Sequence, residues 1–373
     1  MRSTNGSATP GDMGKSPFLS IVVPFHNSAE KCGPLLHSLS QLTPGDEVEL
    51  ILVDDGSTDT TPAILREFAR TSTVGVRLLE RTNGGPGAAR NSGLDMAKGR
   101  FIWFVDSDDD IVPAAVAVAK TFDLAGVDVI AWDYTDPETF CPIVPGMHSA
   151  GEKLAPPSIA QTFVAKWFAA DFIRRNGIRF PEYCAYETAF ELVVPLFVSC
   201  YLKIDFVAYR VVLDPQSVTR DRNGSDPRFY DRLENACIAM SYFRELNLGT
   251  DVRVHLEETF VNFCLWYNVR LTRTPGPMWL RTLRIMRRFR DEAARFDVRV
   301  DPFHLYKGRT RSSAVLRVLW AISKAMPPQD SYFKALRARA WGREISWDRP
   351  TAEPGGAPLM DQPAPSPASS AKH

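Results

Sequence analysis

The chain has 373 residues, of which 45% are hydrophobic and 24% are charged, so it is long enough to bury a sizeable core and to form more than one structural unit. Its 44 Lys and Arg residues balance its 44 Asp and Glu residues, and the whole-chain charge therefore gives no support to a nucleic-acid partner. Six scattered cysteines without a CxxC pair argue against a disulfide framework or a zinc site and fit reduced thiols in a cytoplasmic protein.

Both ends of the chain are predicted to be disordered tails. Residues 1–17 lack the apolar stretch of a secretory signal, and residues 350–373 are rich in Pro, Ala, Ser and Gly. No segment reaches the ~18 uninterrupted apolar residues of a membrane-spanning helix. We therefore expect a cytoplasmic protein with a first domain at residues 18–225 and a second region at residues 226–349.

The first third of the chain alternates between short apolar runs and segments whose apolar residues have helical spacing. Strands are predicted at 19–25, 48–53, 76–80, 101–105 and 127–132, and helices at 28–42, 62–70, 88–99 and 114–122. This order predicts an α/β fold with a Rossmann-like, open, mostly parallel sheet and helices on both of its faces.

The remainder of the chain is predicted to be mainly helical. A helix is predicted at residues 161–177, and helical spacing returns at 232–246, 254–271 and 279–296. We therefore expect the α/β domain to be followed by a mainly α-helical C-terminal region.

Polar residues cluster where three of the predicted strands end. The clusters are Pro24-Phe25-His26-Asn27 after the first strand, DDGSTD at 54–59 after the second, and DSDDD at 106–110 after the fourth. Because parallel strands end at the same edge of a sheet, we expect these clusters to gather there and to bind the ligand. His26 lacks a partner histidine at metal-binding spacing, so we interpret it as a surface or packing residue.

The cluster after the fourth strand places Asp106 and Asp108 two positions apart, beside two further acids. Hard carboxylate oxygens at this spacing suit Mg²⁺ or Mn²⁺, with water and substrate phosphates as the other ligands. The alternative is an acidic loop that stabilises the start of the helix near Val112. The spacing alone favours neither interpretation.

Two further motifs carry groups that suit a nucleotide. Asp54 and Asp55 can accept hydrogen bonds from a ring N–H or a ribose hydroxyl, although such a motif alone is more often just a turn. In TNGGPGAARNSG, glycines lead into a helix and Arg90 offers a guanidinium to a phosphate. Gly85-x-Gly87 also matches part of the dinucleotide fingerprint of oxidoreductases, but Arg90 stands where that fingerprint needs its third glycine.

Four motifs in this order and spacing, IVVPFHN, LVDDGSTD, RTNGGPGAARNSGL and FVDSDD, resemble the inverting glycosyltransferases of family 2, which have the GT-A fold. The similarity covers residues 18–220 and is strongest before residue 115. It implies a nucleotide-sugar donor, usually a uridine diphosphate sugar, and a DxD segment that holds Mn²⁺ or Mg²⁺. It also implies single displacement at the anomeric carbon, as in polysaccharide biosynthesis by hexosyltransferases.

The resemblance implies roles for seven residues of this chain. It places Pro24 and Phe25 near the base, and Asp54 and Asp55 near the uracil and ribose. It places Arg90 near the diphosphate, and Asp106 and Asp108 at the ribose and metal.

Single displacement also needs a base for the acceptor hydroxyl. Family members carry a Glu-Asp pair after a segment like IRFPE, and this chain has GIRFPEYCAYETAFEL, in which Glu187 matches the first acid and Thr188 replaces the second. We predict Glu187 as the base, with Glu182 in reserve. The alternatives are that Glu187 is only an acid at the start of a surface helix, and that the chain is a non-catalytic module that binds a nucleotide sugar.

Residues 280–343 contain sixteen Lys or Arg residues against five Asp or Glu residues. A basic amphipathic helix can lie on an anionic membrane surface, and the acceptors of many relatives of this type are lipid-linked. The alternative is a packed helical region with a solvated basic face. No nucleic-acid recognition motif accompanies the charge, so we expect a saccharide or lipid-linked glycan acceptor, met in the cytoplasm or at its membrane face.

Overall fold

The computed structural model of the chain describes residues 16–44, 47–135, 146–149, 162–182, 187–212, 278–295, 318 and 320–328. The helices predicted at 232–246 and 254–271 lie outside the described residues, and so do most of both predicted tails. The boundaries predicted near residues 225 and 349 also lie outside them and stay predictions.

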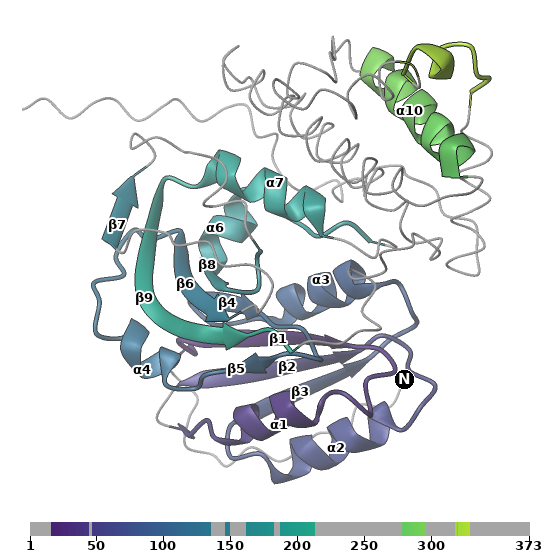
Figure 1. The fold of residues 1–373 in the computed structure, drawn as a ribbon. Helices are drawn as coiled ribbons and strands as arrows, with labels where there is room; N and C mark the ends of the chain where they lie inside the picture. Colours follow the sequence, from purple (N-terminus) through teal and green to yellow (C-terminus); the bar gives the residue numbers. More distant parts are fainter. Residues whose placement is uncertain are drawn as a thin grey trace, which may run out of the picture.

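The described strands form one nine-stranded sheet, in the order β3-β2-β1-β4-β8-β6-β9-β5, with β7 paired to β9 (Figure 1). The strands are β1 (Leu19–Phe25), β2 (Val48–Asp54), β3 (Gly75–Glu80), β4 (Phe101–Phe104), β5 (Asp110–Ile111), β6 (Val129–Thr135), β7 (Gly146–Ser149), β8 (Lys166–Ala169) and β9 (Cys200–Arg210). The first four strands of this order run parallel, as predicted. From β8 onward the sheet is mixed, because β8 runs antiparallel to both of its partners.

Helices cover the parallel part of the sheet on both faces, which agrees with the predicted α/β class. Figure 1 shows α1 (Gly33–Ser40) and α2 (Thr61–Thr71) on one face and α3 (Pro86–Met96) on the other. Each of these three helices has a proline in its first two positions, where the missing N–H costs no hydrogen bond. The other described helices with bounds are α4 (Ala115–Ala119), α6 (Ala170–Arg175), α7 (Thr188–Phe197) and α10 (Met278–Arg295).

The prediction of a helix at 161–177 is wrong in its first half. Residues Lys166–Ala169 form strand β8, and only Ala170–Arg175 are helical, as α6. β8 lies between β4 and β6 in the sheet and buries its first three residues, and its short apolar run Trp167-Phe168-Ala169 is equally compatible with a buried helix.

Three tryptophans mark the line where the parallel and mixed parts of the sheet meet. Trp103 of β4, Trp167 of β8 and Trp132 of β6 are each at most 2% exposed. The ring centroids of Trp103 and Trp167 are 5.3 Å apart, and those of Trp132 and Trp167 are 4.8 Å apart. These large rings stabilise the junction by burying apolar surface and by packing at tilted angles.

The predicted C-terminal helix at 279–296 is present as α10. It buries Leu283 and Met286, while Arg290 donates a hydrogen bond to the Trp320 carbonyl oxygen and lies 4.2 Å from the centroid of that ring. Arg287 donates to the Lys324 carbonyl oxygen at 2.8 Å. These two arginines therefore bind the following segment of the chain, and membrane contact through residues 280–343 stays a prediction.

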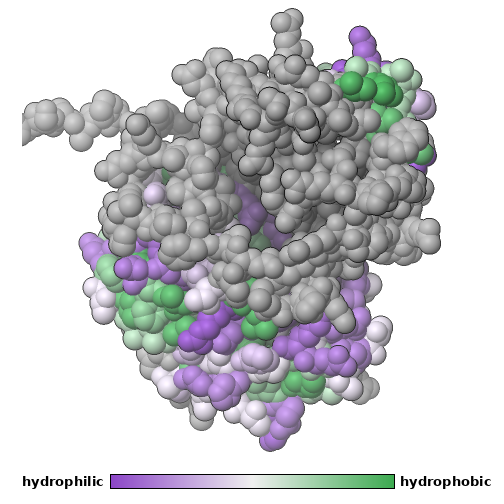
Figure 2. Space-filling view, in the orientation of Figure 1, coloured by the Kyte–Doolittle hydropathy of each residue, from purple (hydrophilic) through white to green (hydrophobic). Residues whose placement is uncertain are grey.

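Hydrophilic and hydrophobic side chains alternate over the face of the domain in Figure 2. Among the residues with a described structure, none of the helices combines the length and the apolarity that crossing a membrane requires.

Candidate active site

The register of the parallel strands brings the predicted polar clusters to one edge of the sheet. Phe25 at the end of β1 pairs with Asp54 at the end of β2, which in turn pairs with Glu80 at the end of β3. The Asp55 backbone N–H continues this line by donating to the Phe25 carbonyl oxygen at 2.8 Å. The edge where α/β sheets bind their ligands is therefore also the edge where this chain gathers its polar loops.

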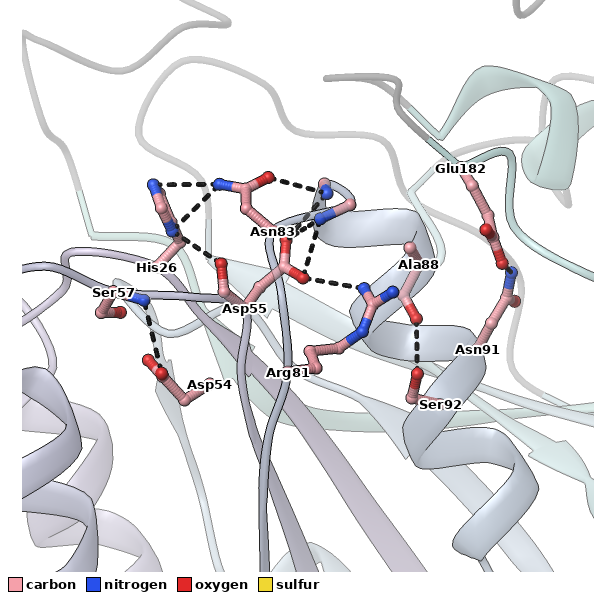
Figure 3. A network of polar contacts seen from close by, with 12 residues as sticks. His26, Asp54, Asp55, Ser57, Arg81, Asn83, Ala88, Asn91, Ser92 and Glu182 are labelled. Atoms are coloured by element: carbon pink, nitrogen blue, oxygen red, sulfur yellow. Dashed lines mark hydrogen bonds and ion pairs between the residues drawn. The ribbon is translucent and has the colours of Figure 1, made fainter. Parts of the chain in front are cut away.

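The Asp55 carboxylate organises the turn that leads into α3 (Figure 3). It accepts hydrogen bonds from Arg81 at 2.7 Å and from the backbone N–H groups of Gly85 at 2.7 Å and Gly84 at 3.1 Å. Gly85 has φ +88°, a conformation that favours glycine. Burial raises the pKa of Asp55, although the Gly84 N–H and the Arg81 charge oppose that rise. Asp55 thus has its hydrogen-bonding capacity largely used within the protein.

Asp54 differs from its neighbour in the chain. It is 3% exposed, and its Oδ2 accepts a hydrogen bond from the Ser57 N–H at 3.3 Å, but its buried Oδ1 has no partner. A buried acceptor without a donor is unfavourable by about 1–3 kcal/mol. A bound molecule that donates an N–H or O–H to Oδ1 would relieve this cost.

Two residues that were not predicted as site residues lie beside Asp55. The His26 Nδ1 is 2.9 Å from the Asp55 carbonyl oxygen, and the Asn83 amide nitrogen is 3.3 Å from both ring nitrogens of His26 (Figure 3). Both residues follow parallel strands, β1 and β3, whose ends meet here. His26 belongs to the predicted strand-end cluster, although its lack of a partner histidine suggests a surface or packing role, and Asn83 has no predicted role. Position after a strand end is the signal that points to both.

Pro24 and Phe25, which the family resemblance places near the base, are both buried in β1. Phe25 is 1% exposed and belongs to the hydrophobic core. A direct role for their side chains in binding stays a prediction, whereas their backbone fixes the position of the next two residues.

The acids after β4 do not all point to one place. Asp109 accepts hydrogen bonds from the Tyr209 hydroxyl at 2.5 Å and from the Val212 N–H at 2.8 Å, and burial together with the Asp106 charge raises its pKa to about 7. Asp110 accepts hydrogen bonds from Ser38 and from Arg210, the latter at 3.1 Å. Hydrogen bonds from protein groups thus hold these two acids and offset part of the repulsion within the cluster.

Asp106 and Asp108, like Asp110, are half-buried. Within the described part of the chain, no group of three or more His, Cys, Asp or Glu side chains could enclose a metal ion. Mg²⁺ and Mn²⁺ commonly use one or two protein carboxylates and take their other ligands from water and substrate phosphates. The chemistry of this pair of donors therefore fits a divalent cation that arrives with a phosphorylated substrate.

Arg90 of α3 joins the predicted base to the predicted donor site. Its Nη1 donates to the Glu187 Oε1 at 2.5 Å, and its Nη2 donates to the Asp106 Oδ1. Burial alone would lower the pKa of Arg90, but the charges of Glu187 and Asp106 outweigh it and raise that pKa. Burial also raises the pKa of Glu187, although the Arg90 charge opposes this, and Asp106 adds to the rise.

Glu182, the reserve candidate for the base, lies on a different side of α3. The Asn91 side chain donates to its Oε1 at 3.2 Å and to the Phe180 carbonyl oxygen at 3.0 Å (Figure 3). Glu187 is the N-cap residue of α7 and makes no capping hydrogen bond through its side chain. Of the two candidates, Glu187 is therefore the one that shares a guanidinium with the acid-rich loop.

Residues 20–131 match the family model Glycosyl transferase family 2. TarS from Staphylococcus aureus, a poly(ribitol-phosphate) beta-N-acetylglucosaminyltransferase, is 41% identical over 104 residues, which are 28% of this chain and 18% of TarS. A poly(ribitol-phosphate) beta-glucosyltransferase from Bacillus spizizenii is 45% identical over 96 residues, which are 25% of this chain and 15% of that protein. These matches span less than a fifth of the length of either relative.

The crystal structure of S. aureus TarS 1-349 in complex with UDP resembles the whole arrangement. It superposes with a TM-score of 0.58 at 21% identity, over 89% of this chain and 94% of that one. At this level of identity the likeness concerns the fold, and it confirms the predicted GT-A architecture.

Proposed function

Because residues 20–131 match the family model Glycosyl transferase family 2, we propose that the chain transfers a sugar from a nucleotide diphosphate donor to an acceptor hydroxyl, with inversion at the anomeric carbon. The observation that carries the proposal is the contact of Arg90 with both Glu187 and Asp106. It brings a candidate base and a candidate donor-binding acid to one place from segments 81 positions apart in the chain.

The donor is proposed to be a uridine diphosphate sugar bound at the ends of β1, β2 and β3. Asp54 offers the buried acceptor Oδ1, which a ring N–H or a ribose hydroxyl can satisfy, and Asp55 fixes the glycine turn beside it. His26 and Asn83 lie at the same edge with polar atoms for a nucleoside. TarS, which shares the fold, has been crystallised with UDP, and this supports the choice of nucleotide.

Asp106 and Asp108 would hold the Mn²⁺ or Mg²⁺ that the family implies. Such a cation supplies charge neutralisation for a diphosphate leaving group. The protein's own contribution is to keep these two carboxylates half-buried at the site while Asp109 and Asp110 are occupied elsewhere.

Glu187 is proposed as the general base. The acceptor oxygen bonds to the anomeric carbon as the bond from that carbon to the donor phosphate oxygen breaks, the hydroxyl proton passes to Glu187, and the nucleoside diphosphate leaves with the electron pair. Burial raises the pKa of Glu187 towards the range in which a carboxylate can accept a proton efficiently. Thr188 cannot take this role, because a threonine hydroxyl is not basic at neutral pH.

The acceptor is proposed to be a saccharide or lipid-linked glycan hydroxyl. Two relatives are named as transferases to poly(ribitol-phosphate), so a polyol phosphate belongs among the acceptors to be tested. Action in the cytoplasm, or at its membrane face, stays a prediction.

The test is transfer and donor hydrolysis with a panel of nucleotide sugars, with and without Mn²⁺, on wild type, Glu187→Gln and Glu182→Gln. We expect Glu187→Gln to lose about 10²–10⁴-fold in turnover while calorimetry still detects UDP binding, because a base contributes to rate rather than to affinity. A loss confined to Glu182→Gln would move the base to the reserve residue.

The alternative function is a non-catalytic nucleotide-sugar binding module, which Thr188 at the second acid position favours. It predicts saturable UDP binding by a wild-type protein that shows no turnover of any donor. A further alternative is a dinucleotide-dependent oxidoreductase, to which the partial glycine fingerprint points. If that alternative holds, the protein should bind NAD, and this binding should survive Asp108→Asn.

A further inference from the structure

We infer that Arg90 is a positioning residue of the proposed transfer reaction, which holds Glu187 and Asp106 in place, rather than a ligand of the donor diphosphate. The inference rests on the proposed function and deepens it. It departs from the role that family resemblance implies for Arg90, and the two roles make opposite predictions for binding and for rate.

Both outer nitrogens of Arg90 donate hydrogen bonds to groups within the protein. Its side chain is 4% exposed, its Nη1 donates to Glu187, and its Nη2 donates to Asp106. Its Nε is buried and has no hydrogen-bond partner. A phosphate that approached the remaining N–H groups would have to enter this enclosed space beside two carboxylates of the same charge, which is unfavourable.

Two aromatic rings, whose centroids are 5.3 Å apart, pack against the guanidinium from one side. The Arg90 Cζ lies 4.8 Å from the ring centroid of Phe163 and 5.3 Å from that of Phe180, both within cation–π range. Phe180 stacks on Phe190 with a centroid distance of 3.9 Å and an angle of 4° between the rings. Phe190 lies in α7, three positions after Glu187, so the packing against Arg90 also stabilises the start of the helix that follows the candidate base.

Helix α3 has little freedom to move Arg90 elsewhere. A Cβ on Gly87 would lie 1.9 Å from the Pro181 carbonyl oxygen, which shows how closely the helix contacts the segment that contains Phe180. The Asn91 side chain completes this contact, because its Nδ2 donates to the Phe180 carbonyl oxygen and its Oδ1 accepts from the Phe180 N–H, both at 3.0 Å. Arg90 thus projects from a helix that is fixed on both sides of it.

Glu187 is the one acid at the position where the family has a Glu-Asp pair, and Arg90 fixes its orientation. The charged groups that act on Glu187 are Arg90, which opposes protonation, and Asp106, which favours it. The hydrogen bond from Arg90 orients the carboxylate, and the Arg90 charge favours its ionised form against the effect of burial. Where the family has a second acid, Thr188 offers none, so the orientation of Glu187 decides whether a base is present at all.

The experiment compares Arg90→Lys with wild type in steady-state kinetics, UDP calorimetry and the pH profile of turnover. Lysine keeps the charge but cannot hold two carboxylates in one planar fork. We expect turnover to fall about 10²-fold, in line with loss of a positioned base, while the KM for the donor and the Kd for UDP change less than about threefold. The apparent pKa of the acidic limb should rise, because a single ammonium cannot contact both carboxylates as closely and so stabilises ionised Glu187 less.

A diphosphate ligand would behave differently. If the Kd for UDP rises tenfold or more while turnover at saturating donor stays near the wild-type value, Arg90 binds phosphate and the inference is wrong. If turnover falls but the acidic limb stays where it was, Arg90 has only a general structural role, which also overturns the inference.

Arg77→Lys is the matched control, because Arg77 also forms an ion pair with a largely buried glutamate, Glu49, away from the site. It should leave the pH profile unchanged.

If Arg90→Lys does not fold, Phe163→Leu is the second variant, because it removes one ring that contacts the guanidinium without changing any charge. It should lower turnover while leaving UDP binding intact. An unchanged turnover would count against positioning.

Failure of the proposed function is separable from failure of this inference. A wild type without turnover rejects the function, and the ¹³C chemical shift of the Glu187 carboxyl then reports its titration directly in wild type and Arg90→Lys. An upward shift of that titration in the variant supports positioning, and an unchanged titration rejects it.

Discussion

The two acidic loops at the ligand edge, residues 54–59 after β2 and residues 106–110 after β4, are held in different ways. In the first, Asp55 binds the backbone of a glycine turn and the nearby Arg81. In the second, the acids bind side chains that come from α1, α3 and β9, namely Ser38, Arg90 and Tyr209. The first loop is thus held mainly by the backbone of the turn that follows β3, whereas the second is held by side chains from three separate elements.

This difference separates the acids that can meet a substrate from those that cannot. Asp55, Asp109 and Asp110 use their oxygens to hold the loops in place. Asp54 has an unpartnered Oδ1 that a ligand can satisfy, and the half-buried Asp106, whose Oδ1 accepts from Arg90, and Asp108 are the acids proposed to meet a cation. Acid content alone would have counted all six as equivalent.

The largest expected effect comes from breaking the first loop with Asp55→Ala. It leaves the Arg81 guanidinium and the N–H groups of Gly84 and Gly85 without their acceptor, so we expect a loss of about 3 kcal/mol in the free energy of unfolding, measured by urea denaturation. The control is Asp59→Ala, which removes an exposed cap of the Thr61 N–H and should cost about 1 kcal/mol. Equal losses would mean that the glycine turn holds its shape without Asp55.

The helix that both loops contact is tested by Gly87→Ala. The new Cβ would meet the Pro181 carbonyl oxygen at 1.9 Å, and overpacking of this kind costs about 1–3 kcal/mol. Gly33→Ala is the control, because a Cβ there meets nothing within 4 Å and alanine favours the start of α1. Thermal unfolding should show a lower Tm for Gly87→Ala and an equal or higher Tm for Gly33→Ala; the reverse order would contradict the close approach of α3.

The pH dependence of transfer tests the link between the second loop and the candidate base. Turnover requires ionised Glu187, whose pKa is raised above its ordinary 4.5 by burial, so activity falls as the pH drops through that raised value. Below it the rate should fall about tenfold per pH unit, which corresponds to about 1.4 kcal/mol. Initial rates between pH 4 and 8 measure this. An acidic limb at the position of an exposed glutamate would argue against Glu187.

The smallest effect is expected from Tyr209→Phe, which loosens the second loop without removing an acid. The change removes the hydroxyl that donates to Asp109 and accepts the Asp106 N–H at 3.3 Å, so we expect a loss of about 1 kcal/mol on urea denaturation. Ser38→Ala, which removes a donor to the less buried Asp110, should cost less. If Ser38→Ala proves the more damaging, the loop is held mainly by α1 rather than by β9.

Sequence patterns predicted the parallel strands, the helices around them and the edge where ligands bind, because those features follow from local periodicity and from the geometry of βαβ units. They did not predict β8, since its partners β4 and β6 lie far along the chain and no local signal distinguishes its four residues from a helix. They also could not show that the two outer nitrogens of Arg90 donate hydrogen bonds to Glu187 and Asp106, because those bonds depend on how α3 packs near the start of α7.

The tryptophans at the junction of β4, β8 and β6 also give the molecule a built-in optical reporter. Indole rings with centroids 4.8 to 5.3 Å apart couple electronically, so their near-ultraviolet circular dichroism depends on their mutual orientation. Separation of β8 from β4 would remove the coupling between Trp103 and Trp167 even while the surrounding helices kept their far-ultraviolet signal. Spectroscopy on the unlabelled chain can therefore distinguish opening of this junction from unfolding of the domain.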